Sequence, residues 1–235
     1  MSNKICNSIL ILSDQHFPYA HPDIIPFLKA VKKKFKPDTI VNIGDEIDGH
    51  AISFHESEPD LMSAGDELTA AIKAMKPLFK LFPKCYVVES NHGSLVYRKG
   101  RYAGLSKRML RTNNEILCAP AGWTWHFDVV LPTALGNVYF HHGKSGKSGG
   151  LAQSMGMNAV QGHYHSKFQI EYLANPEKLY WDMHVGCLAD DKSLAMGYNK
   201  TTLPRPIVGV GVIINGRPQL IPMVLKKGGK WIGRL

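Results

Sequence analysis

The sequence has few cysteines and no long hydrophobic run. The cysteines are scattered and form no C-x-x-C pair, so they indicate neither a disulfide framework nor a cysteine zinc knuckle; they are Cys6, Cys85, Cys118 and Cys187. No apolar run approaches the roughly 20 residues that cross a bilayer, and only a short apolar stretch follows the start Met-Ser-Asn-Lys. We therefore expect neither a transmembrane protein nor a secreted precursor, and a reducing cytoplasm fits best.

Acidic residues are fewer than basic residues. The 235 residues include 28 Lys and Arg against 19 Asp and Glu, a net charge of +9. This excess of positive charge favours an anionic partner, with nucleic acid as the first candidate and an acidic membrane surface as the second. The alternative interpretation is that the basic surface only aids solubility. With 44% hydrophobic and 20% charged residues, the composition excludes intrinsic disorder. The length predicts a single domain over residues 1–235, and we expect no membrane partner and no obligate protein partner.

Short apolar runs rich in Val and Ile predict buried strands, each followed by polar residues. These runs cover residues 9–12, 39–43, 85–88, 138–140 and 158–161. Helical periods cover residues 23–36, stopped by Pro37, and 66–82, where Pro77 predicts a kink. Alternating strands and helices are typical of an α/β sheet. A hairpin turning at Asn215-Gly216 makes a mixed sheet system the expectation rather than a purely parallel one.

Potential metal ligands follow five of the predicted strands, at the ends where sites form in open α/β sheets. They are Asp14, His16, Asp45, Asn91, His142, His163 and His165. Oxygen and imidazole ligands without thiolates suit Mn²⁺, Fe²⁺, Ni²⁺ or Zn²⁺, and Mn²⁺ is our first expectation. Residues two apart, such as Asp14 and His16, project from the same face of an extended chain. Seven ligands suit two divalent ions that share a bridging carboxylate, an arrangement that clamps both sides of an attack on phosphorus.

The ordered motifs resemble those of the calcineurin-like metallophosphoesterases. That family's pattern is D-x-H, G-D-x-x-D, G-N-H-[DE], H-G and G-H-x-H, in that order. This sequence has Asp14-Gln15-His16, Gly44-Asp45-Glu46-Ile47-Asp48, Ser90-Asn91-His92-Gly93, His142-Gly143 and Gly162-His163-Tyr164-His165. The resemblance covers about residues 8–166; Ser90 replaces the usual Gly, and Gly93 replaces the usual acid. The expected fold is a four-layer α-β-β-α sandwich with two mixed sheets and the metal site at the carboxyl ends of the strands.

The resemblance also implies a role for each site residue. One metal would be held by Asp14, His16 and His165, and a second by Asn91, His142 and His163, with Asp45 bridging both. His92 would face the substrate phosphate and protonate the leaving oxygen or stabilise charge, and Asp48 would orient the His92 ring. We favour His142 over its neighbour His141 as the ligand, because the ligand in the family precedes Gly.

Two basic segments are candidates for substrate contact. The glycine-rich stretch 143–150 fails the G-x-x-x-x-G-K-[ST] phosphate-loop pattern, but its Lys144 and Lys147 would reach substrate phosphates unless the stretch is a plain mobile linker. Residues 97–111 interleave basic and aromatic side chains, and Arg98, Lys99 and Arg101 would track a phosphate backbone. The alternative for this second segment is a solvated helix face.

The function predicted from the sequence is therefore hydrolysis of phosphodiester bonds by a dinuclear metal phosphoesterase, with nucleic acid as the substrate. The first alternative is a phosphomonoesterase that acts on a phosphoprotein or a nucleotide. The second is a non-catalytic protein that binds nucleic acid through its basic surface. The intact ligand set argues against this last reading, because a binding module has no use for His92 beside two metals.

Overall fold

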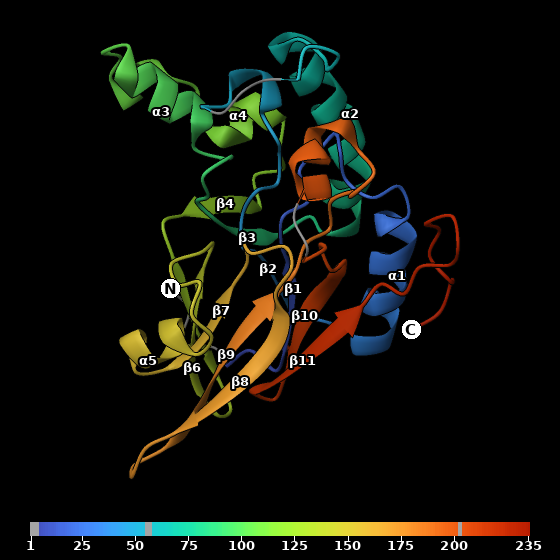
Figure 1. The fold of residues 1–235 in the computed structure, drawn as a ribbon. Helices are drawn as coiled ribbons and strands as arrows, with labels where there is room; N and C mark the ends of the chain where they lie inside the picture. The colour runs from blue at the N-terminus through green and yellow to red at the C-terminus, as the bar shows by residue number, and fades with distance from the viewer. Residues whose placement is uncertain (1–4, 55–57, 202–203) are drawn as a thin grey trace.

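The structure is a computed structural model that describes residues 5–54, 58–201 and 204–235. Within these residues the strands form two sheets (Figure 1), one in the order β11-β10-β1-β2-β3-β4 and one in the order β5-β6-β7-β9-β8. The predicted combination of α/β structure with two mixed sheets is confirmed. No helix in the described part of the chain is both long and apolar enough to span a membrane.

The first sheet is parallel in its centre and antiparallel at one edge. Its parallel strands are β1 (Ser8–Leu12), β2 (Thr39–Asn42), β3 (Cys85–Val88) and β4 (Trp123–His126). The strand β10 (Gly209–Ile214) lies antiparallel to β1 and forms a hairpin with β11 (Arg217–Pro222). The hairpin turns at Asn215 and Gly216, both with positive φ, as the sequence predicted.

The second sheet is also mixed. Its strands are β5 (Val129–Thr133), β6 (Gly136–His141), β7 (Asn158–Gln161), β8 (Phe168–Ala174) and β9 (Leu179–Val185). The central strands β6, β7 and β9 are parallel to one another, and β5 and β8 pair antiparallel at the two edges. Since β6 and β7 are parallel, their carboxyl ends lie at the same edge of this sheet.

Alternating side chains of β1 separate two cores. Leu10 and Leu12 pack toward α1 (Ile24–Phe35) and α2 (Ala64–Leu81), whereas Ile9 and Ile11 pack between the sheets against residues such as Phe140. On the outer face of the second sheet, Leu151 of the short helix α5 (Gly150–Met155) packs against Tyr139 and Ala159. The order of layers is therefore helix, sheet, sheet, helix (Figure 1), as expected.

The predicted elements occur close to their expected bounds. Helix α1 ends at Phe35, where Lys36 adopts a left-handed conformation before Pro37. Helix α2 begins after Ser63, whose hydroxyl accepts a hydrogen bond from the Asp66 N–H, and it continues through Pro77. The five predicted strands correspond to β1, β2, β3, β6 and β7.

Several elements were not predicted from the sequence. Besides β4, β5, β8 and β9, they include the helices α3 (Leu95–Tyr102) and α4 (Asn113–Leu117) and the 3₁₀ segments η1 (His50–Ile52), η2 (Lys107–Met109) and η3 (Leu194–Thr201). Helix α3 holds much of the predicted basic segment. It begins directly after the loop that follows β3, so it starts beside the carboxyl ends of the first sheet.

Candidate metal centre

The site residues lie on loops that adopt an unusual backbone conformation. Asp14, His16, Asp45 and His163 all have positive φ, between 50° and 65°, although none is glycine. Such conformations cost about 1–3 kcal/mol each and cluster at functional sites, where the surrounding structure holds them. Asp14 and His16 do lie close together, as expected, but the predicted reason is wrong. Left-handed turns bring the two side chains together, and the alternation of an extended strand does not.

Backbone pairing between loops fixes the position of these residues. The His16 N–H donates to the Asp45 carbonyl at 2.9 Å, and the Asp14 N–H donates to the Gly44 carbonyl at 3.0 Å. These bonds continue the β1–β2 ladder beyond the ends of both strands. At Gly162 a Cβ atom would collide with the side chains of Ser13 and Asp14, so only glycine allows this close approach.

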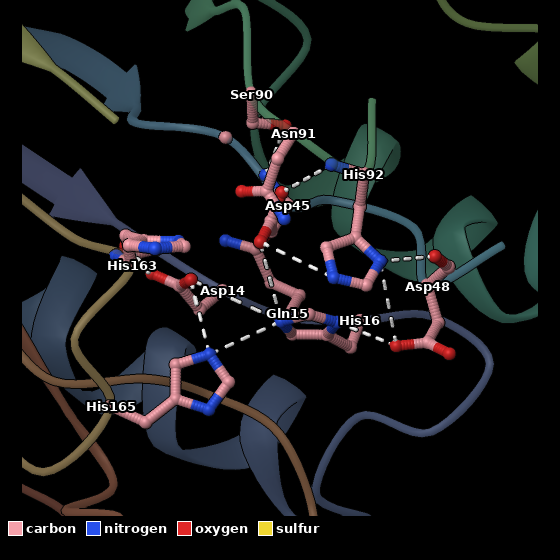
Figure 2. A network of polar contacts seen from close by, with 12 residues as sticks. Asp14, Gln15, His16, Asp45, Asp48, Ser90, Asn91, His92, His163 and His165 are labelled. Atoms are coloured by element: carbon pink, nitrogen blue, oxygen red, sulfur yellow. Dashed lines mark hydrogen bonds and ion pairs between the residues drawn. The ribbon is translucent and has the colours of Figure 1, made fainter. Parts of the chain in front are cut away.

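A first group of donor atoms comprises Asp14, His16 and His165 (Figure 2), as predicted. The His165 Nε2 lies 3.2 Å from both the Asp14 Oδ1 and the His16 Nε2. One ligand atom from each residue lies within 4.8 Å of the others. All three side chains therefore face one small volume, which fits one metal ion.

A second group comprises Asp45, His142 and His163, whose ligand atoms also lie within 4.8 Å of one another. The Asn91 amide oxygen joins this group, at 2.7 Å from the His142 Nε2. The Asp45 Oδ2 lies 3.2 Å from the His142 Nε2 and 3.6 Å from the His16 Nε2. Asp45 thus lies between the two groups, the position expected of a bridging carboxylate.

The ring of His142 faces the cluster and that of His141 does not. The Ile43 carbonyl accepts a hydrogen bond from the His142 Nδ1 at 2.8 Å, which directs Nε2 toward Asn91 and Asp45. His141 instead stacks on Tyr139 with ring centroids 6.2 Å apart, and burial lowers the pKa of His141 to about 4. Of the two neighbours, only His142 is therefore placed to bind a metal in this cluster.

The two buried carboxylates impose a strong negative field on the cluster. Burial raises the pKa of Asp14, but the hydrogen bond from His165 and the charges of His165 and His142 outweigh it and hold that pKa below its usual value. Burial also raises the pKa of Asp45, but the charge and hydrogen bond of His142, together with the charges of His92 and His16, outweigh it and hold that pKa well below its usual range. Burial alone would lower the pKa of His142, yet Asp45 raises it to about 9.

Asp48 contacts a different histidine from the one predicted. Its Oδ1 accepts a hydrogen bond of 2.7 Å from the His16 Nδ1, whereas the His92 Nδ1 lies 3.9 Å from the same oxygen. The His92 Nδ1 donates instead to the backbone carbonyl of Asp48 (Figure 2). The loops explain this arrangement, because the Asp48 N–H donates to the Phe17 carbonyl at 3.0 Å and places the carboxylate beside His16.

His92 lies at the edge of the cluster, with a side chain that is 25% exposed. Its backbone N–H donates to the Asp45 Oδ1 at 3.0 Å, and its Nε2 lies 4.0 Å from the Asp45 Oδ2. Ser90 supports this loop, since its hydroxyl accepts hydrogen bonds from the Asp45 N–H at 2.8 Å and the Gly93 N–H at 3.1 Å. From the sequence, Ser90 was noted only because it replaces the Gly of the family pattern, and this supporting role was not predicted.

The predicted substrate residues separate into two places. Arg98 lines a pocket beside Asn91 and His92, whereas Arg101 of α3 does not line it. The Lys99 ammonium lies 4.3 Å from the ring centroid of Phe54, a residue of the pocket lining.

The structure does not bring Lys144 and Lys147 to this pocket. The Gln161 Oε1 accepts hydrogen bonds from the Lys144 N–H at 3.3 Å and the Ser145 N–H at 3.2 Å, which fixes the start of the glycine-rich stretch against β7. The Lys144 ammonium then lies 5.4 Å from the ring centroid of Phe127, on the His141 side of the loop. Both lysine side chains are exposed to solvent.

No protein-family model matches the chain, and no curated protein matches it. Solved structures do resemble it. A novel archaeal phosphodiesterase is 13% identical with a TM-score of 0.47, over 92% of this chain and 99% of its own. Vps29 from Chaetomium thermophilum is 11% identical with a TM-score of 0.49, over 96% and 93%. YfcE, a phosphoesterase from E. coli, is 14% identical with a TM-score of 0.42, over 88% of both chains. At such similarity, function has to be argued from the residues of the site.

Proposed function

We propose that this protein is a metal-dependent phosphoesterase that hydrolyses phosphodiester bonds, with nucleic acid as its substrate. One observation carries the proposal: seven side chains from five loops converge on one cluster, in which Asp45 lies between the group of Asp14, His16 and His165 and that of Asn91, His142 and His163. His92 lies within the same reach of His16 and Asp45. The resemblance of the ordered motifs to the calcineurin-like metallophosphoesterases assigns the same residues. This arrangement supports a site for two divalent ions.

The donor set fits cations. The two buried carboxylates favour positive charge beside them, and Asp14 and Asp45 raise the pKa of His165 and His142 against the effect of burial. A divalent ion in each group would supply such charge in place of protons on these histidines. Nitrogen and oxygen donors without thiolate suit Mn²⁺, and also Fe²⁺, Ni²⁺ or Zn²⁺.

In this proposal Asp14, His16 and His165 hold one ion, Asn91, His142 and His163 hold the other, and Asp45 contacts both. The bound ions would supply Lewis acidity, which withdraws charge from the phosphoryl oxygens and promotes attack by water. The protein contributes the orientation of its ligands. The carbonyl of Ile43 and the carboxylate of Asp48 each fix the ring of a metal-binding histidine.

The surroundings of His92 support a role in proton transfer. Because the Asp48 carbonyl can only accept a hydrogen bond, it fixes a proton on the His92 Nδ1. The Nε2 is then the nitrogen that can exchange a proton, and His92 lines the pocket that opens beside the cluster. We assign it the role of protonating the leaving oxygen of the phosphoester.

Charge supports a nucleic acid as the substrate. The net charge is +9, and α3 carries Arg98, Lys99 and Arg101 directly after the loop of Asn91 and His92. A polyanion gains from such a cluster of cations, because each neutralised phosphate releases counterions. Arg98 is the member of this cluster that lines the pocket at the metal centre.

Asp45→Asn tests the dinuclear site. Protein stripped with EDTA and reloaded with Mn²⁺ is assayed on bis-p-nitrophenyl phosphate, p-nitrophenyl phosphate, a phosphopeptide and single- and double-stranded DNA and RNA. We expect two ions per chain by elemental analysis, no turnover in EDTA, and preference for diesters. Asp45→Asn should lose most of the activity and at least one ion, because the shared ligand becomes neutral.

The outcomes separate the alternatives. Full turnover in EDTA with only trace metal would refute the metal centre. Preference for p-nitrophenyl phosphate or the phosphopeptide would establish the phosphomonoesterase instead. Salt-dependent binding of DNA or RNA with metal bound but no hydrolysis of any substrate would establish the non-catalytic nucleic-acid-binding protein.

A further inference from the structure

A pocket of about 260 Å³ opens directly from the metal centre. Three of its lining residues belong to the cluster itself, namely Asn91, His92 and His163, and the others are Ser53, Phe54, Leu95 and Arg98. Ligand pockets commonly span about 300–1,000 Å³, so this one is small. Its volume suits a phosphate with one attached ring system.

Phe54 presents an aromatic ring at this pocket. It follows η1 in the chain and is 47% exposed, so half of its surface lies outside any core. Single exposed apolar side chains are common on protein surfaces, but this one lines a pocket that also contains a candidate proton donor and two candidate metal ligands. A ligand that covered the ring would remove apolar surface from water next to the reacting phosphate.

Cations surround the same ring. The Arg98 guanidinium carbon lies 4.7 Å from the Phe54 ring centroid, and the Lys99 Nζ lies 4.3 Å from it. An Arg98 nitrogen also donates to the Asn91 carbonyl at 3.3 Å, which ties the guanidinium to the loop of the metal centre. In the described ranges no carboxylate lies within ion-pair distance of Arg98, so its charge is available to an anion.

We propose that Phe54 and Arg98 form a nucleotide subsite, in which Phe54 packs against the base of the nucleotide whose phosphate lies at the metal centre and Arg98 contacts that phosphate. The inference rests on the proposed function and specifies its substrate. A nucleotide combines the two features that the pocket would reward, a planar apolar face and an adjacent negative charge. Stacking on an aromatic side chain tolerates every base, so the subsite favours nucleotides without reading sequence.

Two esters with the same leaving group test the subsite. Methyl p-nitrophenyl phosphate lacks a base, and the p-nitrophenyl ester of thymidine 5′-monophosphate carries one; both release p-nitrophenolate. We expect Phe54→Ala to lower kcat/KM for the thymidine ester by about 5- to 150-fold relative to that for the methyl ester. This range corresponds to the energy that base stacking on an aromatic ring contributes, and most of the change should be in KM. Phe54→Tyr should retain the preference of the wild type.

A control and a binding measurement complete the test. Tyr172→Ala removes an exposed aromatic side chain of β8, outside the pocket, and should leave the ratio between the two esters unchanged. Calorimetry with thymidine 5′-monophosphate on EDTA-stripped protein should show weaker binding for Phe54→Ala than for Tyr172→Ala. An unchanged ratio, or equal losses on both esters, would overturn the subsite. Failure of the wild type to hydrolyse either ester with Mn²⁺ would refute the proposed function instead, and the binding measurement would still decide the subsite.

Discussion

Asp48→Asn distinguishes the contact seen in the structure from the one predicted by the sequence. The Asp48 carboxylate accepts a hydrogen bond of 2.7 Å from the His16 Nδ1, and the two side chains are only 4% and 1% exposed. A buried hydrogen bond to a charged group contributes about 1.5–3 kcal/mol. Asn keeps an oxygen that can accept this bond but removes its charge, so metal binding at the His16 group should weaken by about 10- to 100-fold, the usual loss when the partner of a metal-binding histidine is changed.

The assay measures metal affinity and turnover separately. Mn²⁺ is titrated into EDTA-stripped protein by calorimetry, and hydrolysis of bis-p-nitrophenyl phosphate is followed against Mn²⁺ concentration. We expect Asp48→Asn to shift the activity curve to higher Mn²⁺, with most of kcat recovered at saturation. His50→Gln is the matched control, because the His50 Nδ1 lies 3.8 Å from the other Asp48 carboxylate oxygen and is not placed to bind metal.

The opposite pattern would refute this reasoning. If Asp48→Asn leaves Mn²⁺ affinity unchanged but lowers kcat at saturating Mn²⁺, the carboxylate acts on His92, as the family resemblance implies. The hydrogen bond to His16 would then have no consequence for metal binding.

Three further predictions concern other parts of the site and its support. His92→Ala should keep both metal ions while slowing turnover by about 10²–10⁴-fold, the usual loss for a missing general acid; loss of metal by elemental analysis would make His92 a ligand. Ser90→Ala leaves two backbone N–H groups without their acceptor, so thermal unfolding of metal-free protein should show a loss of about 2 kcal/mol and a Tm lower by about 4–8 °C. Ser154→Ala, which removes a single side-chain hydrogen bond within a helix, is the control. A decrease in Tm for Ser90→Ala no larger than that for Ser154→Ala would contradict this role of Ser90. Burial lowers the pKa of His184, so the unfolded chain binds a proton more readily and stability is lost as pH falls below about 6.5. His184→Gln should therefore flatten the dependence of the unfolding free energy on pH between about 6.5 and 5 in urea titrations, and an unchanged slope would refute this.

The candidate ligands could be found from the sequence because each lies within a few residues of a strand end. Short Val- and Ile-rich runs located the strands, and parallel strands place their carboxyl ends at one edge of a sheet. Asp14, Asp45 and His142 follow β1, β2 and β6 closely enough that no long-range information is needed to group them. The left-handed backbone of Asp14, Asp45 and His163 was not foreseen, because φ depends on pairing between loops that a local pattern does not record.

Strands that the sequence reading missed fall into two kinds. The β8 strand does carry a signal, since Phe168, Ile170 and Tyr172 alternate with polar residues, a period of two that predicts a half-exposed strand. In β5 the signal is weaker, because Pro132 interrupts the run and is tolerated only on an edge strand such as this one. Missing these strands did not affect the grouping of the ligands, which lie on loops after other strands.

The residues proposed to contact substrate are harder to find from the sequence, because they reach the pocket through tertiary contacts. Sequence proximity to Asn91 and His92 suggested the basic residues of α3, yet among the three singled out there only Arg98 lines the pocket, because successive residues of a helix point in different directions. Phe54 carries no such signal: it is more than 30 residues from His92 and follows a different strand. The pocket joins the loop after η1 to the start of α3, so its shape depends on how two separate crossovers of one sheet meet beside the candidate metal ligands.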